Sequence, residues 1–310
     1  MAPNSSDEGG DAPLELPRPQ RSGRRGAAVT PRDSHPALEV AAEARVTLIL
    51  GTSDTGKTSL AARLAGALAA RGDRVAVVDA DVGQSEIGPP TTVGLGRVTG
   101  ELARLADAEV LALEFVGDTS PVRYIRETAE ATGRLVRRAL SAGFERVLVD
   151  TGGLVEGPLG LALKRAKIRA VDPDLVLVLQ RRDESEPIAR ALESGGARPR
   201  VVRLAPSSAV VRRTATRRRE HRERILRDYL ARAATIELDT ARIPLRDRRG
   251  TAVADVEPGR LLGVLDSAGE TLGIARVRAC KPDEGRLVVE TPVAADRIAT
   301  LIAGRATWGG

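Results

Sequence analysis

The residues with the clearest chemical meaning lie at positions 51–58, where a glycine-rich segment ends in lysine and threonine. Their sequence, Gly-Thr-Ser-Asp-Thr-Gly-Lys-Thr, matches the G-x-x-x-x-G-K-[ST] pattern at every fixed position. In such a loop the backbone N–H groups surround phosphate oxygens, the lysine reaches the β- and γ-phosphates, and the next hydroxyl ligates Mg²⁺. The pattern predicts a site for a nucleoside triphosphate with Mg²⁺. The expected nucleotide-binding residues are Gly51, Thr52, Ser53, Asp54, Thr55, Gly56, Lys57, Thr58 and Ser59.

Two carboxylates follow the next apolar run, Val75–Val78. Asp79 and Asp81 stand two positions apart, and Gly83 and Gln84 come directly after them. At the carboxyl end of a parallel strand they would lie beside the phosphates. There one carboxylate organises Mg²⁺ and the other orients or deprotonates an attacking hydroxyl. The competing interpretation is structural, since aspartate often begins a turn after a strand.

Arginines dominate residues 210–233. This stretch holds nine arginines and three acidic residues, so its net charge of +6 equals that of the whole chain. The excess is too large for paired bridges along a helix and favours contact with phosphate. The alternative is a solvated basic face.

These residues need a scaffold, and the hydrophobic pattern indicates one. Short apolar runs alternate with helical patterns near 58–71, 122–142, 158–169 and 186–195, which predicts a parallel sheet covered on both faces. The fold class expected is therefore a three-layer α/β domain with a mostly parallel sheet. The predicted strands are Val46–Leu50, Val75–Val78, Val110–Phe115, Val147–Val149, Leu175–Leu179 and Val201–Leu204.

The ends of the chain differ from this central part. Residues 1–43 are rich in Pro, Gly, Ser and charge, which predicts a disordered tail. The P-loop domain spans 44–234, including an arginine-rich segment at 207–233. Short β-type runs with turn signals then predict a small β-rich domain over 235–310. The predicted strands in it are Leu261–Leu265, Leu272–Val277 and Arg286–Glu290.

Composition narrows the class of protein. The 310 residues include one cysteine and two histidines, which excludes an internal disulfide framework and leaves little for a metal cluster. No run approaches the roughly 18–20 apolar residues of a membrane span, so we expect no membrane association and a soluble, cytoplasmic protein. Arginine supplies 44 of the 48 basic residues, so the high pI partly reflects composition bias.

Three segments together resemble a known family. Residues 79–90, Asp-Ala-Asp-Val-Gly-Gln-Ser-Glu-Ile-Gly-Pro-Pro, follow the P-loop as they do in the P-loop polynucleotide 5′-hydroxyl kinases. This family includes the kinase of eukaryotic pre-mRNA cleavage and tRNA splicing, a nucleolar rRNA-processing kinase and archaeal relatives. Residues 115–121 and 147–157 resemble further family segments, the second being its clasp. The resemblance covers about residues 44–310.

The resemblance implies an ATP-dependent kinase that phosphorylates the 5′-hydroxyl of RNA, with DNA as the alternative acceptor. It makes Lys57 and Thr58 the phosphate and Mg²⁺ ligands and Asp81 the group that activates the acceptor. It also implies an arginine-rich lid whose Arg-x-x-x-Arg pattern holds the transferring phosphoryl group. Both Arg213/Arg217 and Arg218/Arg222 have that spacing, so the register stays open.

The remaining expectations concern Mg²⁺ and the substrate. Asp79, Asp81 and Asp150 are expected to assist Mg²⁺ beside Thr58, and Gln84, Thr151, Gly152 and Leu154 to meet the substrate. Leu154 stands where many relatives carry tryptophan, whose ring stacks on the first base. Leucine lacks a π face and forfeits much of the roughly 1–3 kcal/mol per base that stacking supplies. Binding would then depend on arginine–phosphate contacts and be sensitive to salt.

Three other functions remain open. Residues 150–153 satisfy the D-x-x-G pattern of GTPases, but residues 180–183, Gln-Arg-Arg-Asp, match a guanine-reading Asn-Lys-x-Asp poorly. A non-catalytic ATP-bound scaffold in RNA processing and a kinase for a small acidic metabolite are the other two. The sequence names no protein partner.

Overall fold

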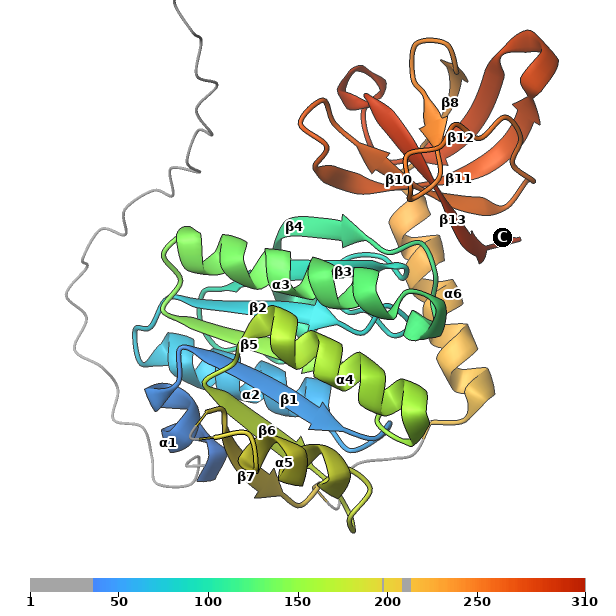
Figure 1. Cartoon of the computed structure of the whole chain (residues 1–310). Helices are drawn as coiled ribbons and strands as arrows, with labels where there is room; N and C mark the ends of the chain where they lie inside the picture. Colours follow the sequence, from blue (N-terminus) through green and yellow to red (C-terminus); the bar gives the residue numbers. More distant parts are fainter. Residues whose placement is uncertain (1–35, 197, 208–212, 310) are drawn as a thin grey trace, which may run out of the picture.

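The computed structural model describes residues 36–196, 198–207 and 213–309, and its main feature is a sheet with helices on both faces (Figure 1). Five parallel strands form the centre in the order β7-β6-β1-β5-β2. Strands β1, β2 and β6 are buried along their whole length, as expected for strands covered on both sides. The predicted three-layer α/β fold is confirmed. The strands are β1 (Val46–Gly51), β2 (Val75–Ala80), β5 (Arg146–Thr151), β6 (Leu175–Leu179) and β7 (Arg200–Leu204).

Each face of this sheet has its own apolar core. One core joins α1 and α2 to the sheet, and the other joins α3, α4 and α5 to the opposite face. The amphipathic helices bury small and branched side chains against the strands and leave charged residues outside. The helices are α1 (Pro36–Glu43), α2 (Lys57–Ala70), α3 (Ile125–Ser141), α4 (Gly157–Val171) and α5 (Glu186–Glu193).

Helix α1 corrects the predicted disordered tail. Residues 36–43, assigned to that tail, form a helix that contacts α2 and β6. Ala37, Leu38 and Ala41 bury completely or nearly so, because their spacing places them on one face of the helix. A patch of three small or apolar residues is too short to stand out in a proline- and glycine-rich segment. The rest of the predicted tail lies outside the described residues.

Between residues 46 and 204, one strand of the sheet was not predicted. Strand β3 (Thr92–Val98) pairs antiparallel with β2 and with β4 (Glu109–Phe115), so the predicted strand at 110–115 has only antiparallel neighbours. Two glycines weaken the strand signal in β3. At Gly94 a Cβ atom would lie 1.9 Å from the Ile87 carbonyl oxygen, so the loop after β2 can cross β3 only over glycine.

The C-terminal strands form a separate core but continue the same sheet. Strand β11 pairs with β10, β12 and, through Thr271 and Leu113, with β4. The three predicted C-terminal strands are present as β10, β11 and β12, while β8, β9 and β13 were not predicted. The strands are β8 (Ala234–Asp239), β9 (Leu245–Arg246), β10 (Arg260–Leu265), β11 (Thr271–Lys281), β12 (Arg286–Thr291) and β13 (Thr300–Thr307).

Helix α6 (Ala215–Leu230) lies at the junction of the two regions, as Figure 1 shows. Thr214 caps it by accepting a hydrogen bond from the Arg217 backbone N–H. Near its end, Leu226 packs with Phe115 from β4 and Ile274 from β11. This small core fixes the carboxyl end of α6, and the arginine-rich amino end reaches the carboxyl edge of the sheet.

Candidate active site

The P-loop connects β1 to α2 as the sequence predicted. Gly51 has a φ of 153°, and a Cβ atom there would lie 2.4 Å from the Leu179 carbonyl oxygen, so only glycine fits. Gly56 has a φ of 87° and caps α2. Lys57 is 7% exposed, and its Nζ donates a 2.6 Å hydrogen bond to the Thr52 carbonyl oxygen. Burial lowers the pKa of Lys57, and the nearby carboxylates of Asp150 and Asp81 oppose that effect.

Asp150, at the end of β5, lies directly behind the P-loop threonine. Thr58 Oγ1 donates a 2.5 Å hydrogen bond to Asp150 Oδ2, while Asp150 Oδ1 is buried without a hydrogen-bond partner. Burial raises the pKa of Asp150 to about 6, and Lys57 and the Thr58 hydrogen bond act against the rise. An orphaned carboxylate oxygen beside the P-loop hydroxyl fits Mg²⁺, which in phosphate sites keeps several waters and needs only one or two carboxylates.

Asp79 and Asp81 have different surroundings. Asp79 is 1% exposed, and its two oxygens accept hydrogen bonds from the backbone N–H groups of Asp81 (3.1 Å), Glu86 (2.6 Å) and Ile87 (3.1 Å). Burial, with Asp150 nearby, raises the pKa of Asp79 to about 8. It therefore organises the loop after β2, which is the structural interpretation that the sequence left open.

Asp81 faces a cavity of about 1020 Å³. Its Oδ1 accepts 3.1 Å hydrogen bonds from the backbone N–H groups of Gly83 and Gln84. Its Oδ2 has no hydrogen-bond partner in the described chain. The described residues hold no cluster of three or more His, Cys, Asp or Glu side chains suited to a metal, so the three aspartates do not converge on one ion.

The segment after β5, the predicted clasp, lies against both the P-loop and Asp81. A Cβ atom on Gly152 would approach the Asp81 carboxyl group to 3.2 Å, and one on Gly153 would lie 2.2 Å from Ser53 Oγ. Gly153 is thus needed for this close approach, and Gly152 makes the contact with Asp81 tight. Thr151 is buried, and its hydroxyl donates to the Ile49 carbonyl oxygen at 2.8 Å. Leu154 lines a second cavity of about 800 Å³ beside the P-loop.

Two buried lysines on α4 support the carboxyl edge of the sheet, and the sequence did not predict a role for them. Lys164 Nζ donates to Thr151 Oγ1 at 2.9 Å and to the Gly152 carbonyl oxygen at 2.5 Å. Lys167 Nζ donates to the Ala80 carbonyl oxygen at 2.6 Å. Burial lowers the pKa of Lys167 to about 8 and that of Lys164 well below its usual value, while nearby aspartates oppose the shift. The sequence carried one signal for them: they are two of only four lysines.

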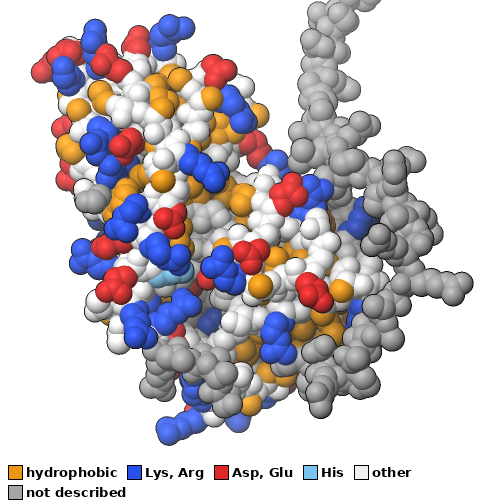
Figure 2. All heavy atoms as spheres, turned by 180° about the vertical axis from the view of Figure 1, so that it is seen from behind, with side chains coloured by type: hydrophobic (Ala, Val, Ile, Leu, Met, Phe, Trp, Pro, Cys, Tyr) orange, Lys and Arg blue, Asp and Glu red, His pale blue; other side chains and the backbone are white. Residues whose placement is uncertain are grey.

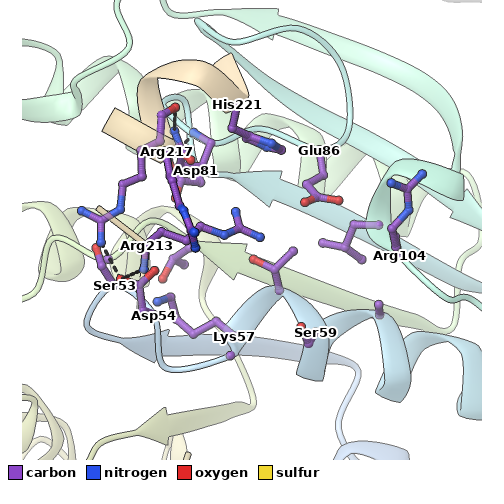
Figure 3. Close-up of a pocket in the computed structure, with 18 of the residues that line it drawn as sticks. Ser53, Asp54, Lys57, Ser59, Asp81, Glu86, Arg104, Arg213, Arg217 and His221 are labelled. Atoms are coloured by element: carbon purple, nitrogen blue, oxygen red, sulfur yellow. Dashed lines mark hydrogen bonds and ion pairs between the residues drawn. The ribbon is translucent and has the colours of Figure 1, made fainter. Parts of the chain in front are cut away.

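Helix α6 brings arginines to the opposite wall of the larger cavity (Figure 3). Arg218 forms a 2.6 Å ion pair with Asp54 of the P-loop, and the Arg213 backbone N–H donates to the same Asp54 oxygen. Gln84 Nε2 donates to the Arg218 carbonyl oxygen at 3.2 Å. Arg213, Arg217 and Arg218 line the cavity, whereas Arg222 is not among its lining residues, so only the Arg213/Arg217 pair has both members there.

The face that carries α6 is strongly basic. Figure 2 shows many Lys and Arg side chains gathered around the described histidine, with fewer acidic side chains between them. A basic wall above a P-loop provides a field that attracts polyanions. In the described part of the chain no helix is long and apolar enough to cross a membrane.

The fold and this site define a P-loop nucleotide-binding protein. Residues 51–232, more than half of the chain, match the family described as mRNA cleavage and polyadenylation factor CLP1 P-loop. The chain belongs to this family, in agreement with the resemblance found in its sequence.

Relatives with assigned names support the same placement. The chain is 41% identical over 146 residues to a polyribonucleotide 5′-hydroxyl-kinase of Pyrococcus horikoshii, covering 47% of this chain and 40% of that protein. It is 35% identical over 189 residues to the enzyme of that name from Pyrococcus furiosus, covering 61% and 51%. Clp1 of Xenopus tropicalis, also named as such a kinase, is 31% identical over 197 residues, covering 59% and 43%. The chain thus spans about half the length of these relatives.

A solved structure has the same fold. A complex of Clp1p with Pcf11p matches with a TM-score of 0.69 at 14% identity, over 87% of this chain and 78% of that chain. At this level of identity the match shows the fold alone.

Proposed function

We propose that the protein is an ATP-dependent polynucleotide 5′-hydroxyl kinase, with RNA as the favoured acceptor and DNA as the alternative. One observation carries the proposal: a single cavity is lined by Lys57 and Thr58 of the P-loop, by Asp81 and by the arginines of α6. The names of the relatives support the same activity. In this proposal residues 44–234 carry the chemistry, and residues 235–310 form a second domain.

ATP binds through the loop 51–59. Backbone N–H groups and the amino end of α2 hold the phosphates, and Lys57 leaves the Thr52 carbonyl oxygen to reach the β- and γ-phosphates. Thr58 and Asp150 would hold Mg²⁺, which would neutralise negative charge on the phosphates. Asp79 holds the adjoining loop in place and does not itself face the cavity.

Asp81 is the group that prepares the acceptor. With Oδ1 held by the Gly83 and Gln84 backbone N–H groups, Oδ2 accepts the hydrogen bond of the 5′-hydroxyl. The hydroxyl oxygen attacks the γ-phosphorus in line, the bond from that phosphorus to the bridging oxygen breaks, and the proton passes to Asp81. ADP and a 5′-phosphorylated end are the products. Positioning and charge neutralisation account for most of the rate in such transfers.

Arg213, just before α6, and the arginines of α6 act as the lid. Arg213, Arg217 and Arg218 line the cavity, and their guanidinium groups would neutralise the charge that spreads over the γ-phosphoryl oxygens. Arg222 lies outside the cavity wall and is not assigned a catalytic role in this proposal. Gln84, Thr151 and Gly152 border the acceptor end, and Leu154 offers it an apolar contact without stacking.

A GTPase fits the structure less well. The Gln180 side chain, at the position of a guanine-reading asparagine, donates to Glu186 and accepts from the Ser185 backbone N–H. Its amide is thus bound within the protein. A strong preference for GTP over ATP without transfer to oligonucleotides would favour this second function.

The direct test is transfer of labelled γ-phosphate from ATP to matched 5′-hydroxyl RNA and DNA oligonucleotides. Lys57→Ala serves as the inactive control, and its thermal unfolding midpoint shows that the fold is retained. Labelled oligonucleotide with wild-type protein and none with the variant is the expected result. ATP binding without transfer to either acceptor would instead support a non-catalytic scaffold.

A further inference from the structure

Two polar side chains face each other at the end of the larger cavity that lies away from the P-loop apex. His221 extends from α6, and Glu86 comes from the loop after β2 (Figure 3). Both line the cavity, yet no hydrogen bond or ion pair joins them in the described structure. The kinase mechanism proposed above uses neither residue.

The hydrogen-bonding state of His221 follows from its neighbour. Arg224 Nη2 lies 3.1 Å from His221 Nδ1, and a guanidinium group can only donate, so Nδ1 accepts. Burial lowers the pKa of His221, assisted by Arg213 and Arg224 and opposed by Glu86, which favours the neutral ring. In the neutral ring the one proton is then on Nε2. That N–H is buried and has no hydrogen-bond partner.

Glu86 offers the complementary group. Its backbone N–H is held by Asp79 Oδ2 at 2.6 Å, so the residue has a fixed place relative to the loop that carries Asp81. Its carboxylate forms no ion pair or hydrogen bond with any other described residue. An ionised carboxylate is an acceptor only. The cavity end therefore presents one unused donor and one unused acceptor.

A hydroxyl group satisfies this pair best. It can donate to the Glu86 carboxylate and accept from His221 Nε2–H at the same time. Phosphate oxygens only accept hydrogen bonds and would be repelled by Glu86. Carboxylates bind the ribose 2′-hydroxyl in dinucleotide-binding folds, and this hydroxyl distinguishes RNA from DNA.

We propose that Glu86 and His221 form a site for a ribose 2′-hydroxyl. This inference rests on the proposed function, because a kinase acting here brings two ribose units into one cavity, that of ATP and that of the acceptor's first nucleotides. The chemistry recognised is the same for both sources. The arms of the test separate them.

The test measures kcat/KM for phosphoryl transfer with ATP or dATP as donor and with RNA or DNA of the same sequence as acceptor. The variants are Glu86→Met and His221→Phe, which keep side-chain size and remove hydrogen bonding. Glu223→Gln on the same helix is the control, since Glu223 pairs with Arg219 and does not line the cavity. Thermal unfolding midpoints confirm that each variant is folded.

We expect the wild type to prefer the hydroxylated partner by about tenfold or more, because a buried pair left without its hydroxyl is penalised. Each variant should lose that preference by slowing reaction with the hydroxylated partner alone. Loss of the RNA preference assigns the hydroxyl to the acceptor, and loss of the ATP preference assigns it to the donor. Equal loss with all four combinations, or no preference in the wild type, overturns the proposal.

Binding separates this site from the proposed function. Fluorescence anisotropy with labelled RNA and DNA, and competition by ATP and dATP, measure the same preferences without turnover. If phosphoryl transfer is absent but Glu86→Met removes a preference for ribose, the kinase proposal fails and the hydroxyl site stands. If transfer occurs and neither assay shows a preference for ribose, the kinase proposal stands and the hydroxyl site fails.

Discussion

The floor and the wall of the larger cavity are built on opposite principles. The floor is the layer of charged residues beneath the cavity, none of which lines it: Asp79, Asp150 and Lys167 are each 1% exposed and Lys164 is fully buried. Every one of them forms at least one hydrogen bond to backbone or a neighbouring side chain. The wall is made of arginines on α6, and the Arg218 side chain is still 32% exposed despite its ion pair with Asp54.

The floor therefore sets the geometry of the site, and the wall attracts the phosphate groups. Buried charges are tolerated only when they are hydrogen-bonded, and that requirement fixes the strand ends that carry Asp81 and the clasp. The Arg213 and Arg217 side chains form no ion pair with any described acidic residue, so they are available to phosphate. Changes in the floor should therefore alter turnover or folding, while changes in the wall should alter how strongly polyanions are held.

The largest effect is expected where the floor meets the reacting atoms. Asp81→Asn keeps the hydrogen bonds to Gly83 and Gln84 possible but removes the group that takes the acceptor proton. Turnover should fall by about 10²–10⁴-fold while ATP affinity changes little. Labelled-phosphate transfer and equilibrium ATP binding measure the two quantities. Unchanged turnover would refute the role assigned to Asp81.

A matched pair of substitutions tests the wall. Arg217 lines the cavity and Arg222, on the same helix, does not. Arg217→Gln should lower kcat/KM by about 100-fold, whereas Arg222→Gln should change it by less than about threefold. The salt dependence of RNA binding should also weaken in Arg217→Gln, by about 0.7 in the log–log slope for one phosphate contact. A larger loss from Arg222→Gln would mean that the lid register is the other one.

A pH experiment tests the floor by itself. Burial raises the folded-state pKa of Asp79 to about 8, against about 3.8 unfolded. Between these values the folded state holds a proton that the unfolded state releases, so this contribution to stability is present near pH 4 and is lost as the pH rises toward 8. The free energy of unfolding of the wild type minus that of Asp79→Asn should be at least about 1 kcal/mol larger at pH 5 than at pH 8.

Urea denaturation without nucleotide or Mg²⁺ measures this difference. Asp107→Asn, an exposed partner of Arg104, is the control and should show no comparable change between the two pH values. The same gap between wild type and Asp79→Asn at both pH values would mean that Asp79 is not held in its protonated form.

The sequence revealed some parts of the molecule more readily than others. The P-loop and the Asp81 segment could be recognised because their chemistry needs particular residues in consecutive positions. The sheet and most helices followed from hydrophobic periodicity. Strand β3 was missed because Gly94 serves a close approach by the Ile87 carbonyl group, which is a tertiary contact that no local pattern reveals.

The buried lysines show another limit. Lys164 and Lys167 lie three positions apart on α4, and this spacing is also typical of a solvated helix face. Their meaning emerges only when α4 packs on the sheet beside Ala80 and Gly152. Yet arginine occupies 44 of the 48 basic positions, and three of the four lysines are buried at this edge. Lysine carries a compact ammonium group where arginine carries a planar guanidinium group, so the scarce lysines were the available signal.

The smallest expected effect concerns the clasp, residues 147–157. Leu154 follows the two glycines that lie against the P-loop and Asp81, and it is only partly buried at the second cavity. If the wall holds phosphate and little holds the base, an aromatic ring here should improve acceptor binding. Leu154→Trp should lower the acceptor KM by about fivefold, the lower end of what stacking one base supplies, with kcat nearly unchanged.

The comparison of acceptors makes this last prediction specific. The gain should appear with an oligonucleotide that has a normal first base and vanish with one whose first nucleotide is abasic. Leu154→Met, which changes shape without adding a π face, should leave the KM within about twofold. An equal gain with the abasic acceptor would show that the ring acts through packing of the clasp. Weak binding of the first base would then have a cause other than the missing aromatic side chain.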